Sequence, residues 1–253
     1  MADVAFITGA TRPQLLNRLH ISLTQQNVNW QWLVQLDSEA IDWQPTSDDT
    51  GGWLSDDRVR IERNPKTLGS GATRNLALMR STAPYVMCID DDDLLYPNCV
   101  AELLRAAEQD PECFGVWGRT DLMHDADAPA DPVAAEVFRS WPTAGHIPAG
   151  TIGEQFRNDD YFAVHVGATL WRRNHLIAVG GYSALPRSID THPFVCAEAM
   201  FPSRYVDVAT YRYLIHPGQM TQTEYYHAVK TRVHAFTFER AAELRRLFEI
   251  RRP

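Results

Sequence analysis

Four consecutive aspartates, Asp90, Asp91, Asp92 and Asp93, follow the apolar stretch 85–89. Carboxylates that crowd together where a buried strand leaves a sheet repel one another unless a cation compensates their charge. Mg²⁺ and Mn²⁺ prefer oxygen ligands and bridge readily to substrate phosphates. The run therefore predicts a metal–diphosphate site, and the alternative is a solvated acidic loop that binds nothing.

Other residues suited to anion chemistry come earlier in the chain. Arg74 follows two glycines, and its planar guanidinium can pair with a phosphate or a carboxylate, a helix surface charge being the alternative. Asp37 ends the apolar stretch 32–36. The segment 8–11, TGAT, begins like a dinucleotide-binding turn, but Arg12 follows where further glycines would let pyrophosphate approach the backbone. A dinucleotide-binding turn is therefore not expected.

The elements that position these residues alternate in the first half of the chain. Short apolar runs predict strands at 4–8, 32–36, 59–61 and 85–89, and helical spacing predicts helices that begin at 13, 69 and 97. This alternation favours an α/β sheet with parallel strands. Ligands bind outside the carboxyl ends of such strands, and Asp37 and the aspartate run both fall there.

The second half is less regular. Residues 121–160 are rich in Asp, Ala, Pro and Gly, which predicts a long loop that acts as a lid. An apolar stretch at 164–171, a strand at 205–215 and a helix at 224–251 follow. That helix ends in a cluster of arginines, which suits its dipole and is interpreted as a solvated helix end in preference to a binding patch.

Composition limits the partners. The 253 residues include 24 basic and 32 acidic side chains, so the formal net charge is −8. This charge repels nucleic acid and anionic membranes, while an anionic small substrate needs a local countercharge, most simply a metal ion. We expect no signal peptide and no transmembrane segment. The four cysteines lack CxxC spacing, so we expect buried, reduced thiols and a cytoplasmic protein.

Four segments of the first half together resemble family 2 glycosyltransferases of the GT-A fold. The segment 4–16 is similar to the family's opening strand and N-R-P-x-x-L helix start, and 30–37 resembles its second strand with a nucleotide-contacting aspartate. The segment 69–78, GSGATRNLAL, resembles G-x-x-x-A-R-N-x-A-L, and 88–93, CIDDDD, resembles the hydrophobic-D-x-D-D metal motif. The segment 35–39, QLDSE, departs from the usual V-D-D-G-S, so base recognition is expected to differ.

The resemblance continues in the second half. The segment 179–182, VGGY, resembles the V-G-G-F turn before the family's catalytic E-D, although Ile189 replaces the first acid and only Asp190 matches. The segment 211–221, YRYLIHPGQMT, resembles the Y-R-x-H-x-G-S-x-T tail. In some members of the family, the histidine at the place of His216 completes the metal shell.

The resemblance implies an inverting, metal-dependent transfer of a sugar from a nucleotide-diphosphate donor to an acceptor hydroxyl. Asp190 would be the general base. Asp92, Asp90 and His216 would hold Mn²⁺ or Mg²⁺ as a Lewis acid on the leaving diphosphate. The donor-binding residues that it implies are Thr8, Arg12, Asp37, Arg74, Asp90, Asp91 and Asp93. Asn75 is expected to hold a loop.

We therefore expect a single GT-A-like α/β domain with a mostly parallel mixed sheet flanked by helices, and a C-terminal helix. Residues 1–118 would bind nucleotide sugar and metal, 119–221 would form the acceptor and catalytic half, and 222–253 the C-terminal helix. The donor would be a UDP-, GDP- or dTDP-sugar, and the acceptor a glycan or small molecule. The candidates for an acceptor platform, each of which also suits the core, are Trp141, His165, Trp171 and Tyr182.

Two other functions stay open. A metal-dependent phosphohydrolase would use the aspartate run, although Asp92 is not followed by the Gly-Thr of haloacid-dehalogenase-type phosphatases. A non-catalytic nucleotide-sugar-binding relative would explain the missing acid before Asp190. The first should release phosphate from an aryl phosphate, and the second should bind nucleotide with metal but never turn over.

Overall fold

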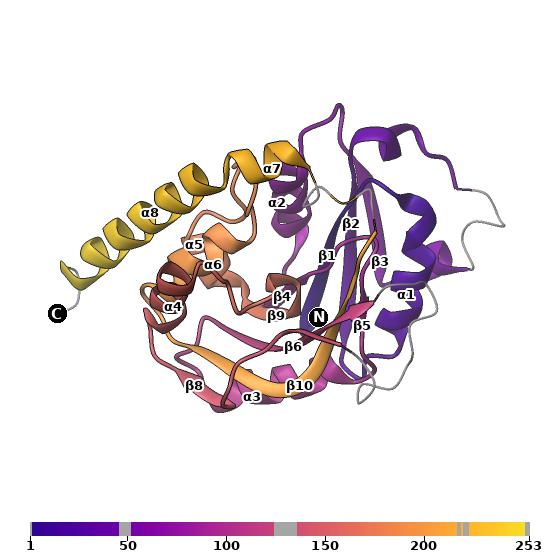
Figure 1. Ribbon diagram of the computed structural model, residues 1–253. Coiled ribbons are helices and arrows are strands. Elements are labelled where there is room, and N and C mark those ends of the chain that lie inside the picture. The colour runs from indigo at the N-terminus through magenta and orange to yellow at the C-terminus, as the bar shows by residue number, and fades with distance from the viewer. Residues whose placement is uncertain (1, 46–51, 124–135, 217–218, 220–222, 251–253) are drawn as a thin grey trace.

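A curled mixed sheet runs through the computed structural model, which describes residues 2–45, 52–123, 136–216, 219 and 223–250 (Figure 1). Within these residues the sheet has ten strands in the order β3-β2-β1-β4-β9-β6-β10-β5, with β7 paired to β6 and β8 paired to β10. Strands β3, β2, β1 and β4 are mutually parallel. Strand β9 lies between β4 and β6 and is antiparallel to both. The predicted mixed α/β architecture is therefore confirmed.

The first half follows the predicted alternation closely. Its strands are β1 (Val4–Ala10), β2 (Trp30–Leu36), β3 (Val59–Arg63), β4 (Tyr85–Cys88) and the short β5 (Leu94–Leu95). Its helices are α1 (Leu16–Thr24), α2 (Ser70–Arg80) and α3 (Cys99–Gln109), with single 3₁₀ turns at Pro13–Leu15, Ser38–Asp42 and Trp53–Ser55. The aspartate run leaves β4 at the carboxyl end of the parallel strands, as expected.

The second half corrects the prediction of one long loop over 121–160. Strand β6 (Gly115–Met123) extends into it, and β7 (Val137–Arg139), β8 (Gly145–Ile147) and α4 (Thr151–Asp159) lie within it. Strands this short show no periodicity, and pairing with β6 and β10 stabilises them. The remaining part of the predicted lid, 124–135, lies outside the described residues.

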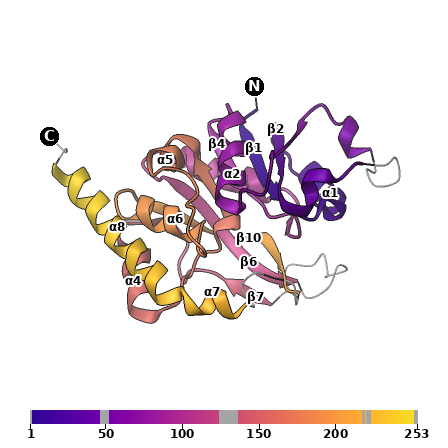
Figure 2. The same ribbon diagram turned by 90° about the horizontal axis from the view of Figure 1, so that it is seen from above.

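The remaining helices and strands lie between residues 166 and 250. They are a 3₁₀ turn at Val166–Ala168, β9 (Thr169–Arg172), α5 (Arg173–Ala178), α6 (Thr191–Glu198), β10 (Ser203–Leu214), α7 (Glu224–Ala228) and α8 (Lys230–Ile250). Helices α5 and α6 were not predicted, and the expected C-terminal helix is divided in two at Val229. Helix α8 runs across α6 (Figure 2). Among the described helices, none is both long and apolar enough to cross a membrane.

Two hydrophobic cores lie on the two faces of the sheet. In β1, Val4 and Phe6 pack into the core that includes α1 and α3, while Ala5 and Ile7 pack into the one that includes α2, α5 and α6. Successive side chains of a strand point to opposite faces, so a strand buried on both sides is apolar throughout. The polar groups that leave these strands are consequently concentrated at the strand ends. All four cysteines are buried and free, as expected.

Candidate active site

A cleft of about 910 Å³ opens beside the aspartate run. Its walls come from the segment after β1, the N-terminus of α2, the segment after β4, the segment before α6 and the end of β10. The expected site residues that line it are Arg12, Arg74, Asp90, Asp91, Asp92, Asp190 and His216. Residues spread over more than two hundred positions are thus brought to one opening.

Asp91 fixes the segment after β1. Its Oδ2 accepts hydrogen bonds from the backbone nitrogens of Thr11 (2.7 Å) and Arg12 (2.8 Å), and its Oδ1 accepts from Nη2 of Arg12 (2.6 Å). Burial raises the pKa of Asp91 above its ordinary value, and the facing guanidinium limits the rise. Asp91 therefore places a cation directly over the aspartate run.

Asp92 and His216 form the pair of candidate metal ligands that the resemblance implied. Oδ2 of Asp92 lies 3.0 Å from Nε2 of His216, although 124 residues separate them. The guanidinium of Arg12 bridges both, with Nη2 at 2.7 Å from Asp92 and Nη1 at 2.7 Å from His216. A carboxylate oxygen and an imidazole nitrogen converging on a cleft suit Mn²⁺ or Mg²⁺. The donor set fits a metal, which would take the position of the Arg12 guanidinium.

Asp90 lies at the same opening and pairs with Arg74. Burial alone would raise the pKa of Asp90, but the charge and hydrogen bond of Arg74, together with the charge of Arg12 and the nearby His165, lower it. Helix α2 holds Arg74 in place because the helix packs tightly on the segment before α6. A Cβ at Gly71 would lie 2.0 Å from the carbonyl oxygen of Ser183, so only glycine allows this approach.

Asn75 holds the loop that the sequence analysis assigned to it. Its Nδ2 donates to the carbonyl oxygen of Tyr182 (2.9 Å), and its Oδ1 accepts from the Tyr182 nitrogen (2.8 Å). The side-chain amide of Asn75 thus both donates to and accepts from the backbone of Tyr182. This contact fixes the turn that leads to Asp190.

Asp93 anchors the end of β10. It is 1% exposed, and its carboxylate accepts from the Tyr211 hydroxyl (2.9 Å) and the Leu214 nitrogen (2.9 Å). Burial, and then the charges of Asp92 and Asp90, raise the pKa of Asp93 well above its ordinary value. Asp93 thus positions the strand end that carries His216.

Thr8 and Asp37 also lie behind the cleft wall. The Thr8 hydroxyl accepts from Nε1 of Trp32 (2.9 Å), and the Asp37 carboxylate accepts from the nitrogens of Leu68 and Gly69 (both 2.9 Å). Like Asp93, they line neither cavity of the site. These three buried side chains hold neighbouring segments of the chain in place, and their expected contacts with the donor stay predictions.

Asp190 caps helix α6. It is the N-cap residue of the helix, and its Oδ1 accepts a hydrogen bond from the nitrogen of the next residue, Thr191 (2.7 Å). The side chain lines both the large cleft and a second cavity of about 340 Å³. Asp190 therefore stands where two ligands could meet.

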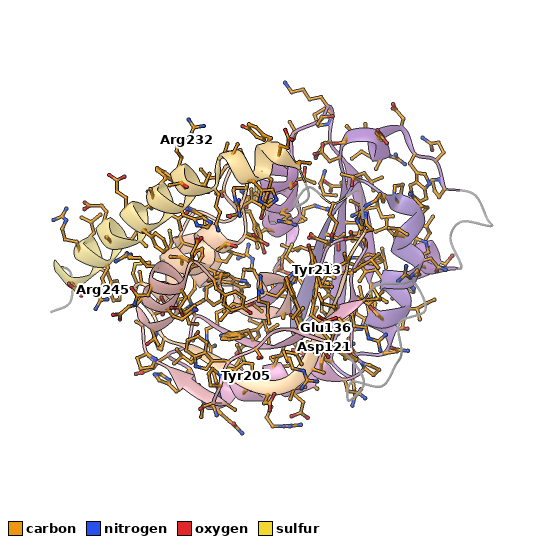
Figure 3. All side chains as sticks on the ribbon, in the orientation of Figure 1. Asp121, Glu136, Tyr205, Tyr213, Arg232 and Arg245 are labelled. Carbon is orange, nitrogen blue, oxygen red and sulfur yellow. The ribbon has the colours of Figure 1, made fainter. Side chains whose placement is uncertain are left out.

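The second cavity is lined by aromatic and basic side chains that the sequence analysis did not select, except His165. They come from β7, the segment after α4, the segment before α6, the end of β10, α7 and α8, and are Phe138, Arg139, Tyr161, Arg187, Tyr213, Tyr226, Lys230 and His234. Tyr213 lies near the centre of the molecule in Figure 3. The other platform candidates are core residues: Trp171 and Tyr182 are buried, and Trp141 packs edge-on against Trp117. No local pattern could have found the new ones, because elements far apart in the chain bring them together.

Another group of potential metal ligands lies away from the cleft. Among the described residues, Asp110, Cys113 and His146 bring their ligand atoms within 4.8 Å of one another. Asp110 already pairs with His146 (2.9 Å) and Arg204 (3.4 Å), and none of the three residues lines either cavity. This cluster ties the end of α3 to the strands β8 and β10, and it is no substitute for Asp92 and His216 at the cleft.

Comparison with protein families agrees with this arrangement. The family model described as "Glycosyl transferase family 2" matches residues 42–180, more than half of the chain. This range includes the aspartate run and Arg74 but ends before Asp190 and His216. No curated protein matches the chain significantly.

Solved structures give the fold. TarS 1-349 of S. aureus in complex with UDP-GlcNAc is similar with a TM-score of 0.68 and 12% identity, over 98% of this chain and 71% of that one. The structure of TarS 1-349 in complex with UDP has a TM-score of 0.68 and 13% identity, over 98% of this chain and 70% of that one. The mannosyltransferase PcManGT from Pyrobaculum calidifontis, in complex with GDP-Man and Mn²⁺, gives 0.57 and 15%, over 96% of this chain and 64% of that one. The chain spans 60% of a further TarS 1-349 structure. These likenesses confirm the expected GT-A type of fold.

Proposed function

Since this chain belongs to glycosyltransferase family 2, we propose that it moves a sugar from a nucleoside-diphosphate donor to an acceptor hydroxyl, with inversion at the anomeric carbon. The observation that carries the proposal is the place of Asp190 between two cavities. The large cleft, with Arg12, Arg74 and the aspartates, would hold the donor. The smaller cavity would hold the acceptor.

The proposed reaction needs one base and one leaving-group stabiliser. The acceptor oxygen attacks the anomeric carbon while the bond from that carbon to the diphosphate oxygen breaks, and the diphosphate leaves with the electron pair. The acceptor proton passes to Asp190. Within the described residues, Thr191 donates to Oδ1 of Asp190, and no hydrogen bond reaches Oδ2. Oδ2 therefore has capacity for the proton.

The donor side would be held by cations and a metal. Mn²⁺ or Mg²⁺, bound by Asp92 and His216 with Asp90 beside them, would act as a Lewis acid that stabilises charge on the diphosphate. Arg74 and Arg12 supply guanidinium groups that suit phosphate oxygens. UDP, GDP and dTDP sugars are all candidates, and the neighbours in complex with UDP-GlcNAc and with GDP-Man support this range.

A thermal-shift panel tests donor and metal together. UDP, GDP and dTDP are added with Mn²⁺ or with chelator. At ~100-fold excess over its dissociation constant a ligand adds about 2.7 kcal/mol, or roughly 5–11 °C for a chain of this size. We expect one of the three nucleotides to raise the melting temperature, and only when Mn²⁺ is present. The Asp92→Asn variant should lose this increase. Equal shifts with chelator contradict the metal assignment.

The two alternative functions predict other outcomes. In a phosphohydrolase of the haloacid-dehalogenase type, an aspartate would attack phosphorus, whereas Oδ2 of Asp92 contacts Arg12 and His216. Release of phosphate from an aryl phosphate would favour that class. Nucleotide binding without any transfer or donor hydrolysis would favour the binding-only relative.

A further inference from the structure

Arg187 is a buried cation whose hydrogen-bond partners are neutral. It is 8% exposed, its Nη1 donates to the Tyr226 carbonyl oxygen (2.7 Å), and its Nε donates to the Ser188 hydroxyl (3.3 Å). Its guanidinium also lies 3.8 Å from the centre of the Tyr226 ring. Within the described residues it forms no ion pair with a carboxylate. Buried charges are normally paired, so this cation is available to an anion from outside the chain.

Arg139 is a second cation with neutral contacts, and it is half-buried. Its guanidinium lies over the rings of Phe138 (3.9 Å) and Tyr161 (4.5 Å), and its hydrogen bond goes to the Phe138 carbonyl oxygen (3.2 Å). In the described part of the chain it too meets no carboxylate. It lines the second cavity but not the donor cleft.

The other charged groups around this cavity are already compensated or are used by the proposed reaction. Lys230 pairs with Asp160 (2.6 Å), which also faces His234 (3.6 Å), and Asp90 pairs with Arg74. Burial lowers the pKa of His165 to about 4, so this imidazole is neutral at neutral pH. Within the described residues, Arg139 and Arg187 are therefore the cations of this cavity that form no ion pair with a carboxylate, and Arg187 also lines the donor cleft.

Aromatic rings supply the rest of the cavity wall. The rings of Phe138 and Tyr213 are stacked, with centroids 5.2 Å apart and planes inclined by 8°. Tyr161 and Tyr226 line the same space. Ring faces of this kind suit the apolar face of a sugar, and a pair of guanidinium groups suits a carboxylate or phosphate.

Building on the proposed function, we propose that the acceptor is a sugar that carries an anionic group, a carboxylate or a phosphate, held by Arg139 and Arg187 in the second cavity. The anion fixes the orientation of the acceptor, and Asp190 at the cavity edge receives the proton of its reacting hydroxyl. Because the chain has a net charge of −8, an anionic acceptor needs local cations near the carboxylate of Asp190, and Arg139 and Arg187 supply them.

Matched sugar probes test the proposal. Binding of glucose, glucuronate and glucose 6-phosphate is measured by ligand-observed NMR on the full chain, loaded with Mn²⁺ and the nucleotide that the thermal-shift panel selects. The two anionic probes should bind at least ~10-fold more tightly than glucose, since hydrogen bonds to charged partners are the stronger ones. Comparing the two anions distinguishes a uronic acid from a phosphosugar.

Variants locate the effect. Arg139→Gln should weaken binding of the anionic probes by ~10-fold or more and leave glucose unchanged, and Arg139→Lys should restore part of the loss. Arg105→Gln is the matched control, because Arg105 lies exposed on α3 and pairs with Glu102. A thermal shift with nucleotide in each variant reports whether it is folded.

The outcomes separate this inference from the proposed function. Glucose binding as tightly as the anions, no probe binding at all, or identical behaviour of Arg139→Gln and Arg105→Gln overturns the anionic acceptor. If nucleotide diphosphate with Mn²⁺ fails to bind the unaltered chain, the proposed function itself fails. If nucleotide binds and the anions show no preference, only the acceptor inference fails.

Discussion

The Arg12 guanidinium contacts Asp92 and His216, the two side chains that we propose as metal ligands, so its removal should affect stability and metal affinity in opposite directions. The guanidinium lies 2.6 Å from Asp91, 2.7 Å from Asp92 and 2.7 Å from His216. In Arg12→Gln the charge is lost while a polar side chain remains. We expect the metal-free variant to be less stable and to bind Mn²⁺ more tightly than the unaltered chain.

The magnitude follows from these contacts. The side chain of Arg12 is 32% exposed, while the side chains of Asp91 and Asp92 are 3% and 9% exposed, so solvent screens the pairs only in part. Asp91 keeps its two backbone hydrogen bonds, so the loss falls mainly on Asp92. A hydrogen bond to a charged group is worth about 1.5–3 kcal/mol, and we take about 2 kcal/mol here. This corresponds to a melting temperature lower by roughly 4–8 °C and a Mn²⁺ dissociation constant about 30-fold lower.

The assay is a Mn²⁺ titration followed by electron paramagnetic resonance of the free ion, without nucleotide. Thermal unfolding is recorded in parallel, with and without Mn²⁺. Arg105→Gln serves again as the control, with neither property changed. An unchanged or weaker Mn²⁺ affinity in Arg12→Gln would refute the idea that arginine and metal compete for Asp92 and His216.

Three further changes test other contacts. Asp190→Asn should lower transfer by about 10²–10⁴ in rate while nucleotide binding in the thermal-shift panel persists, and normal turnover would place the base elsewhere. Tyr211→Phe leaves a buried Asp93 oxygen without its hydroxyl partner, so the free energy of unfolding should fall by about 1–3 kcal/mol in denaturant titrations, whereas Tyr225→Phe, at an exposed residue, should change nothing. Burial raises the pKa of Glu198 from 4.5 to about 7, so its protonated form favours the fold below pH 4.5 and this stability is lost as the pH rises through 7. Glu198→Gln should remove that loss, which is on the order of 3 kcal/mol, and an unaltered pH profile of unfolding would contradict the assignment.

Local patterns in the sequence were enough for the first half of the fold and for the position of the aspartate run. Strands β1, β2 and β4 are mostly apolar runs, β3 alternates apolar and charged residues, and α2 and α3 follow glycine and proline signals, so the type of each element depends on neighbouring residues. The resemblance added the expectation that His216 joins Asp92, and the structure brings them to 3.0 Å.

The tertiary structure decided which of the selected residues face the cavities. Within the aspartate run, Asp90, Asp91 and Asp92 line the cleft, while Asp93 turns inward to Tyr211, 118 residues away. No local pattern distinguishes four identical neighbours, because the direction of each carboxylate depends on which distant donor satisfies it. The Thr8 and Asp37 side chains are likewise buried, and their partners could not be read from the sequence.

The acceptor side of the site was also beyond the sequence. Arg139 and Arg187 lie in short segments without periodicity, and each is an ordinary surface residue by type. They become notable only when β7, the segment before α6 and helix α7 enclose them and leave them facing no carboxylate in the described chain. Whether a charged side chain can bind a ligand depends on its burial and on its partners, and both are set by contacts between elements far apart in the chain.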